Sequence, residues 1–274
     1  MDAVGGKRIN IRHIIFILMA LAVALPLIFK LGLPLRVTDE VRDVYGFIDS
    51  LPENSTVLIS FDHDTSTLPE MVPLAEAILR HCFRNNIKVI GLALLAEGAA
   101  VGDDNLRRIA GEYHKEYGRD YLFLGFRPQF TVAILSMGED IAREFPRDYR
   151  GVDIHNYPIM NNIKNYKDIS AVISIADGDM PLYWINYAQA RYGVKVIPEV
   201  TAVMATTMYP FLQSGQLVGL VAGLKGAAEY EKLLGKPGLA SKGMDAQSTA
   251  HILIVLLIIV GNVVYFINRR KMRI

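Results

Sequence analysis

The sequence predicts an α/β domain with a mostly parallel, Rossmann-like or flavodoxin-like sheet, placed between two transmembrane helices. Between residues 56 and 200, short apolar runs alternate with amphipathic segments, and the runs are apolar on both faces. Strands of that kind belong to parallel sheets with helices on each side, and right-handed crossovers then give this topology. An uncharged stretch near each end of the chain predicts the two spans.

Composition limits the classes of function. The 274 residues suffice for one large domain or two small ones. The formal net charge is +1, so the basic field of a nucleic-acid-binding protein is missing and nucleic acid is not an expected partner. Cys82 is the one cysteine, which excludes an intrachain disulfide. We expect it to be a buried apolar residue.

The first predicted span covers residues 13–35. Residues 14–29 carry no charge, and the Lys30 side chain can reach the membrane surface, so the apolar stretch extends to about Leu35. A signal peptide is the alternative, because Ala22-Val23-Ala24 resembles a cleavage site. Since the apolar run continues past that point, an uncleaved anchor is expected.

The second predicted span covers residues 250–267, where Gly261 and Asn262 indicate a face that meets another helix. Basic residues flank both spans on the sides nearest the chain ends: Lys7, Arg8, Arg12, Arg269, Arg270, Lys271 and Arg273. The positive-inside rule then places residues 1–12 and 268–274 in the cytoplasm. The domain between the spans is expected outside the cytoplasm, with the lipid bilayer of the plasma membrane as a partner.

Between the spans, periodicity predicts a linker helix within 36–55, an α/β domain over 56–235 and a second linker over 236–249. Strands are expected at 56–61, 87–95, 120–126, 169–176 and 194–200. Helices are expected at 70–85, 104–118, 129–145, 159–167, 180–193 and 210–234. The helix at 70–85 has the clearest apolar face: Met71, Leu74, Ala75, Ile78, Leu79, Cys82 and Phe83.

Acidic residues gather where the first strand ends, in "FDHDTST" (61–67). Thr67 and Glu70 match a T-x-x-E capping box, which accounts for the hydroxyl residues. Capping does not explain Asp62, His63 and Asp64, which fall at the carboxyl end of a central strand, where open α/β sheets bind ligands.

A second acidic pair, Asp177 and Asp179, follows the strand at 169–176. The predicted ligand site therefore comprises Asp62, His63, Asp64, Asp177 and Asp179. No cofactor is expected, but Asp62, Asp64 and Asp177 form an alternative site for a divalent cation such as magnesium. In a purely structural alternative, the carboxylates accept loop N–H bonds or pair with Arg80 or Arg127.

The stretch also resembles the first motif of the haloacid dehalogenase-like phosphatases, in which an apolar strand ends in D-x-D-x-T/V. The resemblance implies that Asp62 is a nucleophile and that Asp62 and Asp64 ligate magnesium. Ser66 stands where the family has Thr or Val, and Asp177 and Asp179 stand where it has a second acidic pair.

This resemblance covers only short pieces of the chain. Ser136 is the candidate for the family's phosphate-binding hydroxyl, and Lys164 and Lys167 are the nearest candidates for its lysine. The predicted helix begins almost directly after the strand, which leaves no room for the family's squiggle-and-flap insertion.

An uncharged stretch between Val200 and Lys225 contains regularly spaced glycines. Gly215, Gly219, Gly223 and Gly226 would line one face of the predicted helix 210–234 and admit a second backbone. We interpret this face as an interface with another subunit or with membrane-proximal helices. Packing within the domain is the alternative. A third span is disfavoured by Pro210, Gln213, Ser214, Gln216 and the charge rule.

Other catalytic motifs, such as a P-loop, a dinucleotide fingerprint or a zinc-binding spacing, are missing from the sequence. The predicted function is therefore a non-catalytic scaffold or subunit of a larger membrane assembly, with itself or other membrane subunits as partners. The alternatives are a metal-assisted phosphohydrolase using Asp62 and Asp64, and a domain that senses a small ligand at the strand ends.

Overall fold

The structure is a computed structural model that describes residues 11–29 and 31–271. Its contacts divide the chain into two units. One unit is an α/β domain over Leu35–Ala240. The other is built from the terminal segments, through Pro34 and from Ser241 onward. The predictions made on Lys7, Arg8, Lys30 and Arg273 lie outside the described residues.

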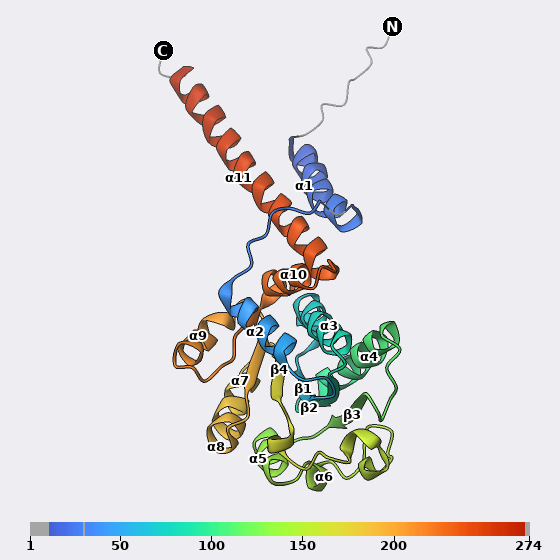
Figure 1. Cartoon of the computed structure of the whole chain (residues 1–274). Coiled ribbons are helices and arrows are strands. Elements are labelled where there is room, and N and C mark those ends of the chain that lie inside the picture. Colours follow the sequence, from blue (N-terminus) through green and yellow to red (C-terminus); the bar gives the residue numbers. More distant parts are fainter. Residues whose placement is uncertain (1–10, 30, 272–274) are drawn as a thin grey trace. The chain divides into compact units, whose positions relative to one another are not determined.

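The α/β domain is built on one parallel sheet, which confirms the predicted fold class. Within the described residues, its six strands have the order β3-β2-β1-β4-β5-β6 (Figure 1). They are β1 Thr56–Asp62, β2 Lys88–Ala93, β3 Tyr121–Phe126, β4 Ala171–Ala176, β5 Val196–Val200 and β6 Val221–Ala222. The strand order reverses between β1 and β4, as in a doubly wound Rossmann sheet.

Helices cover both faces of the sheet (Figure 1). One face carries α2 Asp39–Ser50, α3 Leu68–Arg84, α4 Ala96–Glu112 and α10 Gly223–Leu233. The other carries α5 Phe130–Glu139, α6 Ile141–Glu144, α7 Met180–Tyr183, a π-helical turn Trp184–Gln189 and α8 Ala190–Tyr192. A further helix, α9, spans Ala205–Gln213, and 3-10 turns lie at Thr65–Thr67, Ile154–Asn156, Pro158–Met160 and Tyr166–Asp168.

Packing on the α3 and α4 face follows the sequence pattern closely. All seven residues of the predicted apolar face of α3 are buried. Helix α4 approaches β1 through two glycines one turn apart, Gly98 and Gly102. A Cβ atom at Gly98 would lie 2.0 Å from the carbonyl oxygen of Phe61, so only glycine permits this approach.

Several predicted helix bounds were wrong. Helix α4 starts at Ala96, directly after β2, rather than at 104. The helix expected at 129–145 is divided at Asp140, whose carboxylate accepts the N–H groups of Ala142 and Arg143 and so starts α6. The segment 159–167 forms 3-10 turns instead of an α-helix, and the segment 180–193 contains the π-helical turn.

The predicted helix 210–234 was also wrong. Helix α9 ends at Gln213, Gly215 has φ +74°, and β6 intervenes before α10 begins at Gly223 with φ +60°. The four glycines therefore do not line one helical face, because Gly215 and Gly219 lie in the connecting segment and only Gly223 and Gly226 lie in α10. A Cβ at Gly219 would lie 2.5 Å from the Glu40 carbonyl oxygen and 2.7 Å from Val44 Cγ2. The close neighbour of Gly219 is therefore α2, the membrane-proximal helix predicted within 36–55, and the structure includes α2 in the same unit.

The terminal unit contains two helices that are long and apolar enough to cross a membrane, α1 Ile11–Ile28 and α11 Leu239–Lys271. They support a membrane location. Helix α1 ends at Ile28, before the end of the predicted span 13–35, and beyond it the Asp245 carboxylate accepts N–H bonds from Leu31, Gly32 and Leu33. The linker predicted at 236–249 is helical from Leu239 onward.

Candidate functional site at the carboxyl edge of the sheet

The candidate site lies where the strand order reverses. Strand β1 leads into α3 and β4 leads into α7, and these helices cover opposite faces of the sheet. Asp177, after β4, joins the two loops: its Oδ2 atom accepts bonds from the Asp64 N–H at 2.8 Å and from the Thr67 hydroxyl at 2.7 Å. The structure thus brings together the two acidic segments that the sequence places far apart.

Asp62 points into the protein rather than into the crevice between these loops. It is fully buried, and its Oδ1 atom accepts the N–H groups of Leu94 and Leu95 at 2.6 and 3.2 Å. Its Oδ2 atom accepts the Ser60 hydroxyl at 2.5 Å. Burial raises the pKa of Asp62 to about 6, although these three donors favour the ionised form. Asp62 ties the end of β1 to the end of β2.

The structural alternative predicted that the carboxylates accept loop N–H bonds or pair with Arg80 or Arg127. The loop N–H bonds are present, but within the described residues the ion pairs with these two arginines are not formed. Arg80 instead pairs with Glu76 and Glu112, each through contacts of 2.9–3.1 Å. Arg127 donates to the carbonyl oxygen of Glu144 at 2.7 Å. Neither guanidinium is bonded to an aspartate of the candidate site.

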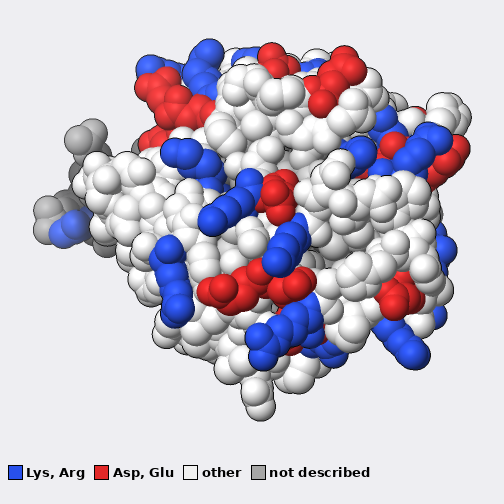
Figure 2. All heavy atoms as spheres, turned by 60° about the horizontal axis from the view of Figure 1, so that its bottom comes forward, with Lys and Arg blue, Asp and Glu red and all other residues white. Residues whose placement is uncertain are grey.

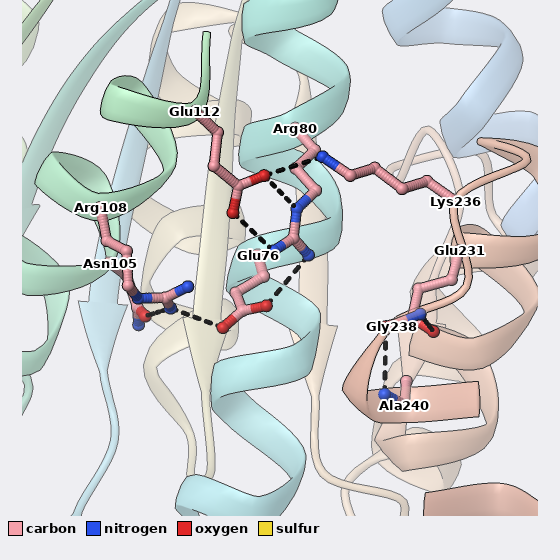
Figure 3. Close-up of polar contacts among 9 residues, drawn as sticks. All are labelled: Glu76, Arg80, Asn105, Arg108, Glu112, Glu231, Lys236, Gly238 and Ala240. Atoms are coloured by element: carbon pink, nitrogen blue, oxygen red, sulfur yellow. Dashed lines mark hydrogen bonds and ion pairs between the residues drawn. The ribbon is translucent and has the colours of Figure 1, made fainter. Parts of the chain in front are cut away.

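The Arg80 contacts belong to a polar network that joins α3, α4 and the segment after α10 (Figure 3). Arg108 bonds Glu76 and Asn105, and Lys236 bonds Glu112 at 2.8 Å. These side chains fasten helices to one another. Nearby, Glu231 accepts the N–H groups of Gly238 and Ala240, which fixes the turn after α10. The network has a structural role.

Asp64 and Thr67 organise the loop, but not as a capping box. The Oδ1 atom of Asp64 accepts both the N–H and the hydroxyl of Ser66 at 2.6 Å, and these bonds lower the pKa of Asp64. Thr67 forms no side-chain cap on α3. Its predicted partner, Glu70, accepts the N–H of Ala202 at 2.9 Å instead. The predicted T-x-x-E capping box was wrong.

His63 and Asp179 differ from the other site residues. His63 is buried, and burial lowers the pKa of its ring, which favours the neutral form. Its Nδ1 atom lies 3.3 Å from the Asp64 carbonyl oxygen, and its Nε2 atom has no partner within the described residues. Asp179 is exposed at the start of α7 and does not cap it.

The carboxylates are not arranged as a cation site. Within residues 11–29 and 31–271, no three His, Cys, Asp or Glu side chains are placed to hold a metal ion. Asp62 directs its oxygens at Ser60, Leu94 and Leu95. The alternative divalent-cation site of Asp62, Asp64 and Asp177 thus finds no support in the geometry.

The other residues that the phosphatase resemblance implies, a lysine and a phosphate-binding hydroxyl, do not lie at this edge of the sheet. Lys167 lies in a turn that precedes β4, and Lys164 lies just before that turn, so both are at the opposite edge of the sheet. Ser136 lies in the second turn of α5 rather than at the end of a strand. None of these three residues stands beside Asp62.

Two buried polar features were missed by sequence reasoning. Ser174 Oγ, in the strand position next to Ser60, forms no hydrogen bond within the described residues, and Trp184 Nε1 interacts with the Asp62 carboxylate without reaching normal hydrogen-bond geometry. On the other face, burial raises the pKa of Glu199 well above its ordinary value, and its Oε2 atom has no partner there. The glutamate inside the apolar run "VIPEV" was the available signal for Glu199.

A cavity of about 200 Å³ opens beside the carboxyl end of β6, between α2, α9 and α10. The lining residues with polar side chains are Thr38, Glu40, Tyr209, Lys225 and Glu229. The buried Glu229 carboxylate accepts the Thr38 N–H and hydroxyl at 2.8 and 2.7 Å and pairs with Lys225. Sequence reasoning missed this cavity, because it depends on contacts between segments nearly two hundred residues apart.

Charged side chains of both signs lie on the face of the molecule that Figure 2 shows. On the face of the α/β domain seen in Figure 2, basic and acidic side chains are interspersed, often as neighbours. That pattern agrees with the formal net charge of +1. Comparison with known proteins adds no assignment: no protein-family model matches the chain, and no curated protein is significantly similar to it.

Proposed function

We propose that the protein is a doubly anchored membrane protein whose α/β domain is a non-catalytic subunit of a membrane assembly. The observation that carries this proposal is the exposure of the apolar side chains of α1 and α11. Ile254, Ile258 and Val260 on α11, for example, are exposed by 41, 57 and 57%. Exposed apolar surface on this scale has a strong preference for lipid over water.

Flanking charges support an orientation with the domain outside the cytoplasm. Arg12 lies at the start of α1, and Arg269 to Lys271 end α11. Uncharged stretches bounded by basic residues on the chain-end sides follow the positive-inside rule with both ends in the cytoplasm.

A non-catalytic role is supported by what the acidic residues bind. Asp62 accepts N–H bonds from the end of β2, Asp64 accepts bonds from its own loop, and Asp177 accepts bonds from the loop after β1. The phosphohydrolase alternative, with Asp62 as the nucleophile, needs that carboxylate to be accessible beside a cation and a phosphate-binding group. The fully buried Asp62 lacks that access.

Membrane extraction and cysteine labelling test this proposal. Starting from a Cys82→Ala chain, we expect Val203→Cys to react with an impermeant maleimide on intact cells, because Val203 is 82% exposed. Asp2→Cys should react only after the membrane is opened. The protein should resist carbonate extraction and dissolve in detergent. Release by carbonate would contradict the anchoring, and labelling of Asp2→Cys on intact cells would contradict the orientation.

A second candidate function, binding of a small ligand, is favoured by the cavity between α2, α9 and α10. Its lining combines the Lys225–Glu229 pair with apolar side chains such as Val41 and Leu220, which suits a small molecule with one polar end. Ala205→Leu fills the cavity. A ligand found by thermal-shift screening of the wild type should fail to stabilise that variant, and equal stabilisation of both would contradict binding in the cavity.

A further inference from the structure

Helix α11 carries one side-chain amide, that of Asn262, in its uncharged stretch over residues 250–267. Asn262 is exposed, and its Nδ2 atom donates to the carbonyl oxygen of Ile258, one turn earlier, at 2.9 Å. That bond uses one of the two N–H donors of the amide and leaves the Oδ1 acceptor without a bond within the described residues. A Cβ atom added at the preceding residue, Gly261, would meet nothing within 4 Å.

An amide in this position is costly if lipid surrounds it. Asn262 lies in the uncharged stretch of α11, seven residues before Arg269, which is about 10 Å along a helix. At that depth, hydrocarbon offers no hydrogen-bond partner. The observed contact between α1 and α11 is elsewhere, where the Thr249 hydroxyl donates to the Ala22 carbonyl oxygen at 2.6 Å.

The residues that share a face with Asn262 have the spacing of a helix-pair seam. Val255, Ile258, Asn262 and Tyr265 are separated by three, four and three positions. The apolar members are exposed by 55, 57 and 57%. This spacing keeps side chains on the contact line of two helices, and one asparagine in such a line favours two parallel strands in a single register.

We propose that α11 pairs in parallel with α11 of a second copy of this chain, through the face formed by Val255, Ile258, Asn262 and Tyr265. The proposal rests on the membrane anchoring proposed above. Two copies inserted in the same orientation place Asn262 at the same depth. Across a two-fold axis, the N–H of each amide meets the Oδ1 of the other, so a second copy satisfies both groups.

Cysteine crosslinking in native membranes tests the pairing. In a Cys82→Ala background, cysteines placed singly at 255, 258, 262 and 265 should form disulfide-linked dimers on mild oxidation. Cysteines at 256, 260 and 263, on the opposite side of the helix, should form few. Equal crosslinking at all seven positions, a preference for the second set, or a product heavier or lighter than two chains would overturn the proposal.

Asn262→Leu measures the contribution of the amide in the full-length protein. It should raise the dimer dissociation constant in lipid nanodiscs by about 3- to 30-fold, the effect expected of one interhelical hydrogen bond. The matched control is Val260→Asn/Asn262→Leu, which keeps the amide but turns it to the other side of α11, and it should not restore the dimer. An unchanged dissociation constant in Asn262→Leu, or rescue by the control, would overturn the pairing.

Carbonate extraction separates this proposal from the proposed anchoring. A chain that stays in the membrane but does not crosslink overturns the pairing and leaves the anchoring intact. A chain that carbonate releases overturns both.

Discussion

Gly219 and Gly261 occupy opposite environments, although the sequence around each is uncharged. A Cβ at Gly219 would collide with the Glu40 carbonyl oxygen and with Val44, both in helix α2, whereas a Cβ at Gly261 would meet nothing. In the α/β domain, small residues mark places where the fold itself supplies the close neighbour. At Gly261 in α11, the described residues place no atom within 4 Å of an added Cβ. Glycine spacing alone does not separate these cases.

Gly219→Leu is the strongest test of that contrast. Leucine would place four carbons where the α2 backbone lies 2.5 Å away, so α2 must move. We expect a loss of about 3 kcal/mol or more in the free energy of unfolding, at or above the usual cost of overpacking. Chemical denaturation of the detergent-solubilised protein, followed by Trp184 fluorescence, measures it.

The matched control lies on α2 itself. Gly46 is exposed and has no atom within 4 Å of an added Cβ. Gly46→Ala should therefore stabilise the domain by up to about 1 kcal/mol through helix propensity. If Gly219→Leu leaves the denaturation midpoint unchanged, the intradomain explanation of Gly219 is wrong, and an interface between subunits regains support.

Asp62→Asn tests the interior of the domain at the candidate site. The pKa of Asp62 is raised from 3.8 to about 6 in the folded protein. The folded state therefore holds a proton that the unfolded state has lost between pH 4 and 6, and stability falls as pH rises through that window. The full loss from this group is about 3 kcal/mol.

Asparagine cannot ionise, and its amide oxygen can still accept the Leu94 N–H. The wild type should therefore lose about 2 to 3 kcal/mol more than Asp62→Asn between pH 4 and 7, as measured by urea denaturation at each pH. Glu199 remains in both chains, so its own pH dependence cancels in the difference. Parallel pH profiles would show that Asp62 titrates normally.

Asp245→Ala probes the terminal unit, where fewer contacts hold the chain. The carboxylate accepts N–H bonds at 2.9–3.1 Å from Leu31, Gly32 and Leu33. Hydrogen bonds to a charged group contribute about 1.5 kcal/mol or more, so amide exchange at these residues should accelerate about tenfold. Hydrogen-exchange mass spectrometry in detergent measures it, with Asp245→Asn as the conservative control. Unchanged exchange would show that these bonds do not protect Leu31, Gly32 and Leu33.

The sequence was sufficient for the parts of the fold that depend on local pattern. Apolar runs located five of the strands, and 3.6-residue spacing located the buried face of α3. It was insufficient where distant residues compete for one group. Thr67 bonds Asp177 rather than capping α3, and Glu70 bonds Ala202, because loops more than a hundred positions away come into reach only after folding.

The candidate site was predicted in position but not in orientation. Asp62, Asp64 and Asp177 do lie at the carboxyl edge where the strand order reverses. The sequence did not reveal that Asp62 points inward to Leu94 and Leu95, because that depends on how β2 ends beside β1. Strand β6 was not predicted, because its two residues lie inside an uncharged, glycine-containing run whose spacing predicts a helix.

Gly261→Ala should have the smallest effect and completes the contrast with Gly219. The added methyl meets no atom within 4 Å, so the unfolding free energy of the α/β domain should stay within about 0.5 kcal/mol of the wild type. Successive residues of a helix differ by about 100° in direction, so Gly261 lies beside the Asn262 face rather than in it. The α11 dimer should persist in nanodiscs, with a dissociation constant close to that of the wild type. A large loss of dimer in Gly261→Ala, with Asn262→Leu unaffected, would mean that two α11 helices meet through the small residue instead of the amide. In that case Gly261 would be the contact residue, and the contact face of α11 would be shifted by one residue from the face that contains Asn262.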